Sequence, residues 1–383
     1  MKELKNIITI NDFNFSQGGA SKVAIDTANM LAEAGYNSIF ISAVSDDKKT
    51  ILNKKVIQYK FHGREFLQYD NKIKGMIDGI KCIKFSRYVE KILDDFNPED
   101  TIVHVHGWTK ACSSDFFNVL KEKKFSTFLT LHEYFSFCPN GAYFNYKKNC
   151  ACTKKGGSLE CLFCNCDSRS YMFKLYRFTR EIQYKRDMDF NYINAIYISE
   201  FERKIIEKQI DTPKATVIYN PVSEIDKGTE QKEYDYIYIG RTSKEKGIDL
   251  FIELAKKLSN KKFLIVGEHS TSLKNLKSTG WISEKEVDEY LKKSFRLVFP
   301  SLWPETFGLN VIKALSVGIP CLVSSNTAAA EFVTNGENGY IFQQGDFSSL
   351  EKVAELQLDG NIKKVKTANY IENVISLWKR GIE

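Results

Sequence analysis

VFPSLWPETFGLNVIKALSVGIPCLVSSNTAAAE, residues 298–331, is the stretch that decides the fold. Its pattern predicts an apolar strand that ends at Pro300, a helix over about 310–317, and a second strand over 320–324. Between the first strand and the helix lie an acid, Glu305, and a glycine turn. In α/β enzymes this order aims one carboxylate and several backbone N–H groups at a ligand beyond the carboxyl ends of the strands. We therefore expect a functional site here.

The same alternation of strands and helices runs along the whole chain and predicts an α/β fold of two doubly wound domains. In the first domain, short β-branched or aromatic runs predict parallel strands at 5–10, 37–42, 101–106, 126–131, 194–199 and 216–219. An apolar stripe of helical period predicts a helix at 20–34. The second domain is predicted to have strands at 234–240, 262–266 and 296–300 and helices at 247–258 and 282–293. Asn220-Pro221 and the polar run 223–232 predict a hinge, and 369–380 predicts a last helix.

The net charge of +7 is unevenly distributed. Residues 1–220 contain 33 Lys and Arg against 26 Asp and Glu, whereas the remaining residues contain 22 of each. This asymmetry predicts an anionic partner for the N-terminal half, which could be a phospholipid surface, a diphosphate-linked lipid or a nucleic acid. A solvated, lysine-rich surface explains it equally well.

The chain shows no apolar run of the length that spans a bilayer. Its first residues, MKELKNIITINDFNF, predict a strand and not a signal peptide, because charged and amide side chains interrupt the apolar run. We therefore expect a cytoplasmic protein that is at most peripheral to the inner face of the cell membrane.

Six motifs occur in order along the chain: SQGGASKVAIDTANMLAEAGY at 16–36, LHEY at 131–134, IYNPV at 218–222, IGRTSKEKG at 239–247, PETFGLNVIKALSVGIP at 304–320 and NGENGYIF at 335–342. Together they resemble the motifs of the family-four glycosyltransferases, which are retaining enzymes of the two-domain GT-B fold. The resemblance covers nearly the whole chain.

The resemblance implies two Rossmann-like domains that face a central cleft. Residues 1–220 would form the acceptor-side domain, with a Cys-rich insertion at about 138–168, and residues 221–366 the nucleotide-sugar-binding domain. Residues 367–383 would form a helix that crosses back to the first domain. The implied activity is a retaining, metal-independent hexosyltransferase of capsule or O-antigen polysaccharide assembly. Its expected partners are a nucleotide-sugar donor and a lipid-linked glycan acceptor, and we expect no nucleic-acid partner.

Two glycine-containing loops are candidates for binding the donor. Gly18 and Gly19 precede the first helix, and Gly240, Arg241 and Lys246 follow the first strand of the second domain. Glycines let a ligand approach the backbone at a helix start, while Arg and Lys bind phosphate oxygens. Fixed cations of this kind can stabilise a departing diphosphate without bound magnesium. The alternative is that the glycines serve only turn geometry and the cations are exposed surface residues.

By resemblance, Glu305 contacts hydroxyls of the transferred sugar, and His132 faces that sugar from the other side of the cleft. The amides of Gly308 and Leu309 would hold the diphosphate. Glu331 matches a further acid of the family, but a role at a helix start suits it equally well. His104 and His106 fall on one face of a strand, where we expect buried histidines with satisfied hydrogen bonds.

Lys313 departs from the family pattern, which usually has a second Glu at this position to bind the ribose hydroxyls. An ammonium cannot accept those hydrogen bonds. Lys313 could instead reach a phosphate, pair with a neighbouring carboxylate, or indicate an inactive site. A catalytically silent GT-B protein that binds a nucleotide or a glycan therefore remains an alternative.

Six of the nine cysteines lie between Cys138 and Cys166. Disulfides are disfavoured in the cytoplasm, so this spacing predicts a structural zinc site. The expected ligands are Cys138, Cys161, Cys164 and either Cys150 or Cys152. An iron–sulfur cluster or free thiols are alternatives, and a zinc module on a basic domain could also bind nucleic acid.

The segment SRSYMFKLYRFTREIQYKRDMDF, residues 168–190, mixes basic and aromatic side chains. It predicts a helix near the mouth of the cleft whose cations and aromatics contact an anionic interface. Equally, the aromatics could pack on the core while the cations remain solvated.

Overall fold

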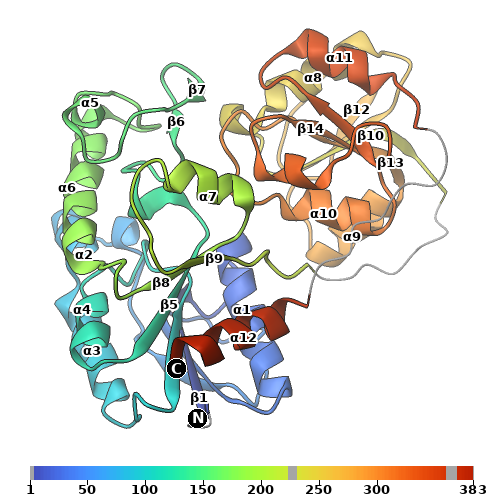
Figure 1. The fold of residues 1–383 in the computed structure, drawn as a ribbon. Helices are drawn as coiled ribbons and strands as arrows, with labels where there is room; N and C mark the ends of the chain where they lie inside the picture. Colours follow the sequence, from blue (N-terminus) through green and yellow to red (C-terminus); the bar gives the residue numbers. More distant parts are fainter. Residues whose placement is uncertain (1–3, 223–230, 359–368, 383) are drawn as a thin grey trace.

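The computed structural model describes residues 4–222, 231–358 and 369–382, and it contains two large parallel sheets covered by helices (Figure 1). The first sheet has the strand order β3-β2-β1-β4-β5-β8-β9. Its strands are β1 (Asn6–Phe13), β2 (Asn37–Val44), β3 (Ile57–Lys60), β4 (Thr101–Val105), β5 (Ser126–Leu131), β8 (Asn194–Tyr197) and β9 (Ala215–Val217). The central strands are buried on both faces, as their runs of Ile, Val and Phe require.

Helices cover both faces of the first sheet. One face packs against α3 (Ile83–Leu93), α4 (Phe116–Glu122) and part of α6 (Tyr171–Asp187), and the other against α1 (Gly19–Glu33). Shorter elements complete the domain: η1 (Phe66–Gln68), α2 (Lys72–Ile80), η2 (Tyr134–Ser136), the hairpin β6 (Phe144–Asn145) and β7 (Cys150–Ala151), α5 (Leu159–Leu162) and α7 (Glu200–Ile206). The sequence analysis did not place β3, α2 or α3.

The second sheet has the strand order β12-β11-β10-β13-β14-β15. Its strands are β10 (Tyr234–Ile239), β11 (Phe263–Val266), β12 (Leu276–Ser278), β13 (Ser294–Phe299), β14 (Cys321–Ser324) and β15 (Gly339–Phe342). Its α-helices are α8 (Ile248–Lys257), α9 (Glu284–Lys292), α10 (Leu309–Ser316) and α11 (Phe347–Ala354). Two doubly wound α/β domains are thus present, as predicted. The expected boundary between residues 366 and 367 and most of the expected hinge, 223–232, lie outside the described residues.

The last helix, α12 (Tyr370–Ile382), packs on the first domain although it follows the second in sequence (Figure 1). Val374 and Trp378 are fully buried against β1, β4 and α1, and the Trp378 ring lies 5.4 Å from that of His104. Tyr370 Oη lies 2.9 Å from Thr27 Oγ1. The chain therefore connects the two domains twice. In the described part of the chain, no helix is both long and apolar enough to cross a membrane.

We expect Trp378→Ala to destabilise the protein, because it removes a fully buried ring that holds α12 on the first domain. Truncation of a buried Trp typically costs about 3–5 kcal/mol of unfolding free energy. Denaturant unfolding of the variant would measure the loss, with exposed Lys379→Ala on the same helix as the control. Equal stability of the two variants would contradict the packing of this helix.

Candidate functional site

The loop after β10 contains the two predicted phosphate-binding cations. Tyr238 donates a hydrogen bond of 2.5 Å to Arg241 O, and the Arg241 side chain is 65% exposed, with its guanidinium 3.9 Å from Glu245. Lys246 ends the short turn η3 (Lys244–Lys246). The next residue, Gly247, has φ 72°, and a Cβ there would lie 1.8 Å from Pro300 O. Only glycine fits this position, which brings the loop against the end of β13.

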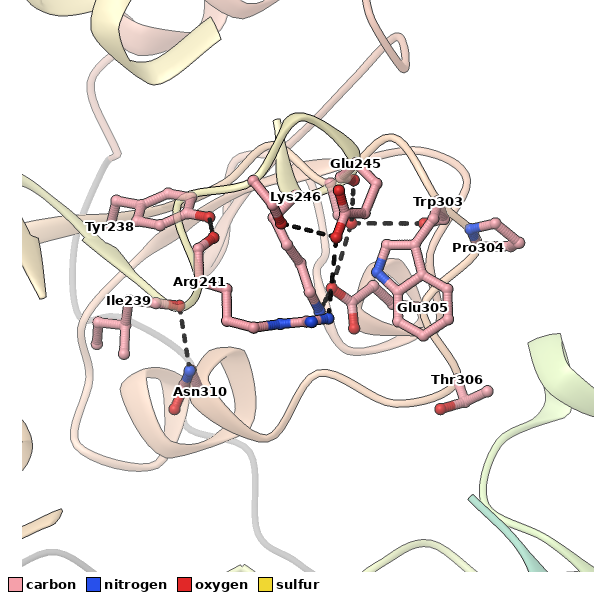
Figure 2. A network of polar contacts seen from close by, with 12 residues as sticks. Tyr238, Ile239, Arg241, Glu245, Lys246, Trp303, Pro304, Glu305, Thr306 and Asn310 are labelled. Atoms are coloured by element: carbon pink, nitrogen blue, oxygen red, sulfur yellow. Dashed lines mark hydrogen bonds and ion pairs between the residues drawn. The ribbon is translucent and has the colours of Figure 1, made fainter. Parts of the chain in front are cut away.

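Glu305, in the loop after β13, lies against Lys246 (Figure 2). Its Oε1 accepts hydrogen bonds from Lys246 Nζ and from Ser301 Oγ, the latter at 3.2 Å. Lys246 Nζ lies 4.9 Å from the centre of the Trp303 ring. The Lys246 and Glu305 side chains are 20% and 11% exposed, so the ion pair is only weakly screened. Lys246 and Glu305, which the sequence analysis predicts from separate motifs, are thus brought together.

The start of α10 lies beside this cluster. Gly308 has φ 110°, and a Cβ there would come within 2.7 Å of Ala329 Cβ, so glycine is required. Asn310 Nδ2 donates to Ile239 O at 3.3 Å, which ties the helix start to the end of β10 (Figure 2). The first N–H groups of a helix, here from Leu309 onward, have no helical acceptor and can bind an anion.

The glycine turn of the first domain faces the same helix start. Gly18 has φ 126° and precedes α1, and a Cβ on Gly19 would lie 3.3 Å from Leu309 Cδ1. The predicted donor-binding glycines of the two domains are therefore close to one another, across the boundary between the domains.

His132 follows β5 and contacts the second domain. Its carbonyl oxygen accepts a 2.9 Å hydrogen bond from Thr306 Oγ1, and its ring Nε2 lies 3.0 Å from His106 Nδ1. Burial lowers the pKa of His132 to about 3, so the ring is neutral at neutral pH. Thr306 directly follows Glu305 in sequence, so His132 lies across the domain boundary from the loop that carries this carboxylate. Because the carbonyl already has a partner, the neutral ring is the better candidate for contact with a sugar hydroxyl.

His104 and His106 are buried on one face of β4 and the loop after it, as expected, but they are only partly satisfied. His104 Nε2 lies 2.7 Å from Thr130 Oγ1. Within the described residues, His104 Nδ1 and His106 Nε2 have no hydrogen-bond partner. Burial lowers the pKa of His104 to about 3, and the pKa of His106 is also well below its usual value. The expectation of fully satisfied histidines is therefore wrong.

Lys313, which we expected among the donor-binding residues, instead pairs with α9. Its Nζ lies 2.8 Å from both Glu284 and Asp288, and its side chain is 8% exposed. Glu284 also pairs with Lys22 of α1 at 3.3 Å. Burial raises the pKa of Glu284, but its contacts with Lys313 and Lys22 outweigh this and lower it. Of the three roles considered for Lys313, pairing with a carboxylate is the one that the structure shows.

The loop that carries Glu305 also joins the two domains, which the sequence did not indicate. Tyr134 Oη donates to Pro304 O at 3.0 Å, and Ser199 Oγ donates to Thr306 O at 2.8 Å. Both donors come from the first domain, and both acceptors are backbone carbonyls. Such partners leave no sequence signal, because any residue supplies a carbonyl.

Glu331 lies in η4 (Ala328–Phe332) and binds the first domain. It accepts hydrogen bonds from Phe201 N at the start of α7 and from Tyr219 Oη, the latter at 3.1 Å. A carboxylate near a helix N-terminus is favourable because of the helix dipole. The role at a helix start is therefore confirmed, although the helix belongs to the other domain.

The six clustered cysteines are all free thiols. Cys138 Sγ donates to Asn140 Oδ1 at 3.2 Å, and Lys174 Nζ lies 3.4 Å from Cys161 Sγ. Over residues 4–222, 231–358 and 369–382, no three His, Cys, Asp or Glu side chains are arranged to hold a metal ion. The zinc site therefore stays a prediction for Cys138, Cys161, Cys164 and either the exposed Cys150 or the partly buried Cys152.

The basic and aromatic segment forms α6, and its six cations divide into two groups: Arg169, Lys185 and Arg186 are exposed, as the solvated alternative predicted, whereas the other three are bonded inside the domain. Lys174 is fully buried and donates to Cys161 O at 2.7 Å. Arg177 pairs with buried Asp167 at 3.0 Å, and Arg180 donates to Thr109 O. Half of the six cations in this segment thus point into the domain and neutralise or bond groups there. These three cations are therefore not available to an external surface.

A large open cavity of about 900 Å³ lies elsewhere, at the amino ends of β5, β8 and β9, with Lys124, Lys214 and Arg380 in its lining. It contains none of the predicted site residues. We place the functional site at the carboxyl ends of the strands, because the cations, the carboxylate and the helix start converge there.

Comparison with known proteins identifies a family domain in the second half of the chain. Residues 223–374, which contain Arg241, Lys246 and Glu305, match the family model described as "Glycosyl transferases group 1". Among curated relatives, an "Uncharacterized 42.6 kDa protein in cps region" of Klebsiella pneumoniae is 24% identical, over 98% of this chain and 100% of that protein. The "UDP-Gal:alpha-D-GlcNAc-diphosphoundecaprenol alpha-1,3-galactosyltransferase" of Escherichia coli is 23% identical, over 48% of this chain and 52% of its own length.

Solved structures share the two-domain architecture. A variant of TarM from S. aureus, in complex with Fondaparinux, alpha-GlcNAc-glycerol and UDP, superposes with a TM-score of 0.66. It is 12% identical, and the match covers 99% of this chain and 100% of that chain. The GT-B fold that the resemblance implied is therefore confirmed.

We expect Lys313→Glu to destabilise the protein, because it would place a third carboxylate beside Glu284 and Asp288. The loss in the free energy of unfolding should be about 2 kcal/mol, which lies between the costs typical of disrupting an exposed and a buried ion pair. Lys313→Met, which removes the ammonium without adding negative charge, should cost less in the same denaturant titration. Tighter nucleotide binding by Lys313→Glu with unchanged stability would instead place this position in the donor site.

Acid should destabilise the folded protein through its buried histidines. Their folded pKa values, about 3 for His104 and His132, lie below the value of 6.5 for an unfolded chain. Between the folded and the unfolded pKa, the unfolded state binds more protons than the folded state does. The contribution of the histidines to stability is therefore complete above the unfolded pKa and is lost as pH falls. Each histidine should lower the free energy of unfolding by about 2 kcal/mol between about pH 7 and pH 5. Unfolding titrations at both pH values, with His104→Asn for comparison, would measure this; a drop that His104→Asn does not reduce would contradict it.

Proposed function

The C-terminal domain of this chain belongs to the glycosyl transferases group 1 family, and on that premise we propose that the protein moves a sugar from a nucleotide-sugar donor to an acceptor hydroxyl. The transfer would take place between the two domains, in the assembly of a surface polysaccharide.

The observation that carries this proposal is the convergence of Arg241, Lys246, the α10 start and Glu305. The nucleoside diphosphate of the donor is the leaving group, so negative charge develops on its phosphate oxygens in the transition state. The open guanidinium of Arg241 and the N–H groups at Leu309 would stabilise that charge. Lys246 would turn from Glu305 to the phosphate, which would free the carboxylate to accept hydrogen bonds from the sugar hydroxyls. Because these cations are part of the chain, we propose that transfer does not require a divalent metal.

The relatives support the classes of donor and acceptor. UDP is bound to TarM, and the name of the Escherichia coli relative specifies UDP-Gal as the donor and a diphosphoundecaprenol-linked sugar as the acceptor. We accordingly propose a nucleotide-sugar donor and a lipid-linked glycan acceptor, bound on the basic first domain. With such an acceptor, the protein would act at the cytoplasmic face of the membrane and contact that membrane peripherally. The Klebsiella pneumoniae relative, from a cps region, fits a role in capsule assembly.

We propose that transfer retains the anomeric configuration by a front-face route. The bond between the sugar's anomeric carbon and the phosphate oxygen would break as the acceptor oxygen bonds to that carbon from the same side. The departing phosphate would take the proton of the acceptor hydroxyl. His132, as a neutral ring, would hold a sugar hydroxyl and would not act as a cationic acid.

A catalytically silent protein was suggested by Lys313 alone. The ion pairs of Lys313 with Glu284 and Asp288 direct its ammonium to α9, away from the Lys246–Glu305 pair. Lys313 therefore neither neutralises nor displaces Glu305. Measured transfer by the unaltered protein would remove this alternative.

Arg241→Ala and Lys246→Ala should each lower kcat/KM about 100-fold to 1000-fold, the usual cost of losing one preorganised group that stabilises transition-state charge. Glu305→Gln should lower kcat with a smaller effect on UDP binding, because Glu305 is assigned to the sugar.

A thermal-shift screen of sugar nucleotides would identify the donor, since a ligand of the folded state raises Tm. Transfer with that donor, in the presence of a chelator, would then be measured.

Lys244→Ala is the matched control, since Lys244 is exposed on the same loop as Lys246. It should transfer sugar at the wild-type rate. Wild-type kcat/KM in both the Arg241 and the Lys246 variants would show that the diphosphate binds elsewhere, and a rate abolished by the chelator would exclude the metal-independent route.

A further inference from the structure

Helix α2 packs on the first domain with its smallest residues inward. Gly75 and Gly79 are buried, and a Cβ on each would lie 2.1 Å from Phe66 O and 2.2 Å from Tyr176 Oη, respectively. The helix therefore lies close to η1 and α6: a side chain at Gly75 would clash with the backbone of Phe66, and one at Gly79 would have to displace the Tyr176 hydroxyl. The large apolar residues of the same helix point outward: Ile73 is 72% exposed, and Ile77 is 59% exposed.

This arrangement is the reverse of the usual one, in which the apolar stripe of a surface helix faces the core. Ile73, Met76 and Ile77 follow the helical spacing that forms one stripe, and all three are exposed. Leu67 before the helix and Ile83 after it are exposed as well. We call these five residues the α2 patch. Exposed apolar side chains that share one helix face, as on α2, mark an interaction surface, whereas single ones need no explanation.

Four lysines lie in or next to α2 in the sequence. Lys72 and Lys74 lie on α2 at either side of its apolar stripe, and Lys81 and Lys84 follow at the junction with α3. All four are exposed, and within the described residues none of them has an ion-pair partner. This differs from α6, where half of the cations are buried and bonded.

An apolar stripe flanked by exposed lysines matches the chemistry of an anionic bilayer surface. The apolar side chains enter the boundary between headgroups and acyl chains, while the lysines contact the phosphates. A partner protein would not require lysines on both sides of the stripe. The position of the helix is also suitable, because α2, α3 and α6 lie on the side of the first domain that faces away from the second domain (Figure 1). A membrane bound there would leave the second domain free to move.

We infer that the α2 patch, with Lys72, Lys74, Lys81 and Lys84, docks the protein on an anionic phospholipid surface. This inference deepens the proposed role at the membrane, but it stands on the surface of α2 and not on the catalytic residues. The two can therefore fail separately.

The test is co-sedimentation of the full chain with vesicles of phosphatidylcholine alone or of phosphatidylcholine with phosphatidylglycerol. The wild type should bind the anionic vesicles, and high salt should weaken the binding. Ile73→Ser with Ile77→Ser should reduce it about tenfold or more, and Lys74→Gln with Lys81→Gln and Lys84→Gln should reduce it on anionic vesicles by a similar factor. Phe295→Ser, which changes a 53% exposed residue of the second domain, is the matched control and should bind as the wild type does.

All variants should retain the wild-type Tm and the wild-type thermal shift with UDP, because the altered side chains are exposed and outside the cleft. Absence of vesicle binding by the wild type, or equal binding by all variants, would overturn the inference. A wild-type dimer in sedimentation velocity that Ile73→Ser with Ile77→Ser dissociates would assign the α2 patch to a second copy of the chain, which also overturns it. Loss of the UDP shift with intact vesicle binding would instead count against the proposed function.

Discussion

The ion pair between Lys246 and Glu305 is the contact on which the site depends. It joins the loops that leave β10 and β13, two neighbouring strands of the second sheet, at their carboxyl ends. The loops can approach because Gly247 lies against the backbone of Pro300, where a side chain would not fit. A largely buried pair of this kind offers little net stability, since desolvation offsets much of the attraction. Its consequence is positional: it holds an ammonium and a carboxylate side by side, where the proposed sugar-nucleotide donor would bring both phosphate and hydroxyl groups.

The loop that carries Glu305 has a second function, because it also makes contacts between the domains. The residue before Glu305 accepts a hydrogen bond from Tyr134, and the residue after it is bonded to both Ser199 and His132. A change in the relative position of the domains would therefore act directly on the backbone at either side of the carboxylate. Any closure of the domains would therefore change the geometry of the site, as in enzymes that close to exclude water. The pair between Lys22 and Glu284, together with Lys313, adds a second connection between the domains near the start of α1.

The number of cations in the sequence does not by itself locate a surface for an anionic partner. The first half of the chain has an excess of seven cations, but Lys174, Arg177 and Arg180 of α6 are bonded inside the domain. Exposed lysines that have no ion-pair partner in the described part of the chain lie instead beside the apolar residues of α2 and at the start of α3. Burial, and not composition, thus decides which part of a basic domain can meet an anionic partner.

The sequence by itself determined the two doubly wound domains and most strands of the site, because apolar runs and glycine turns follow from local sterics and burial. It also indicated Arg241, Lys246, Glu305 and the glycines at the helix starts as candidate site residues, since each lies within a few residues of a predicted strand end. Only the tertiary structure decided what Lys313, Glu331 and the histidines contact, because their partners are backbone groups or side chains distant in sequence. The same holds for α2: its glycines face the domain because of the backbone of Phe66 and the hydroxyl of Tyr176, and no pattern within the helix reveals those neighbours.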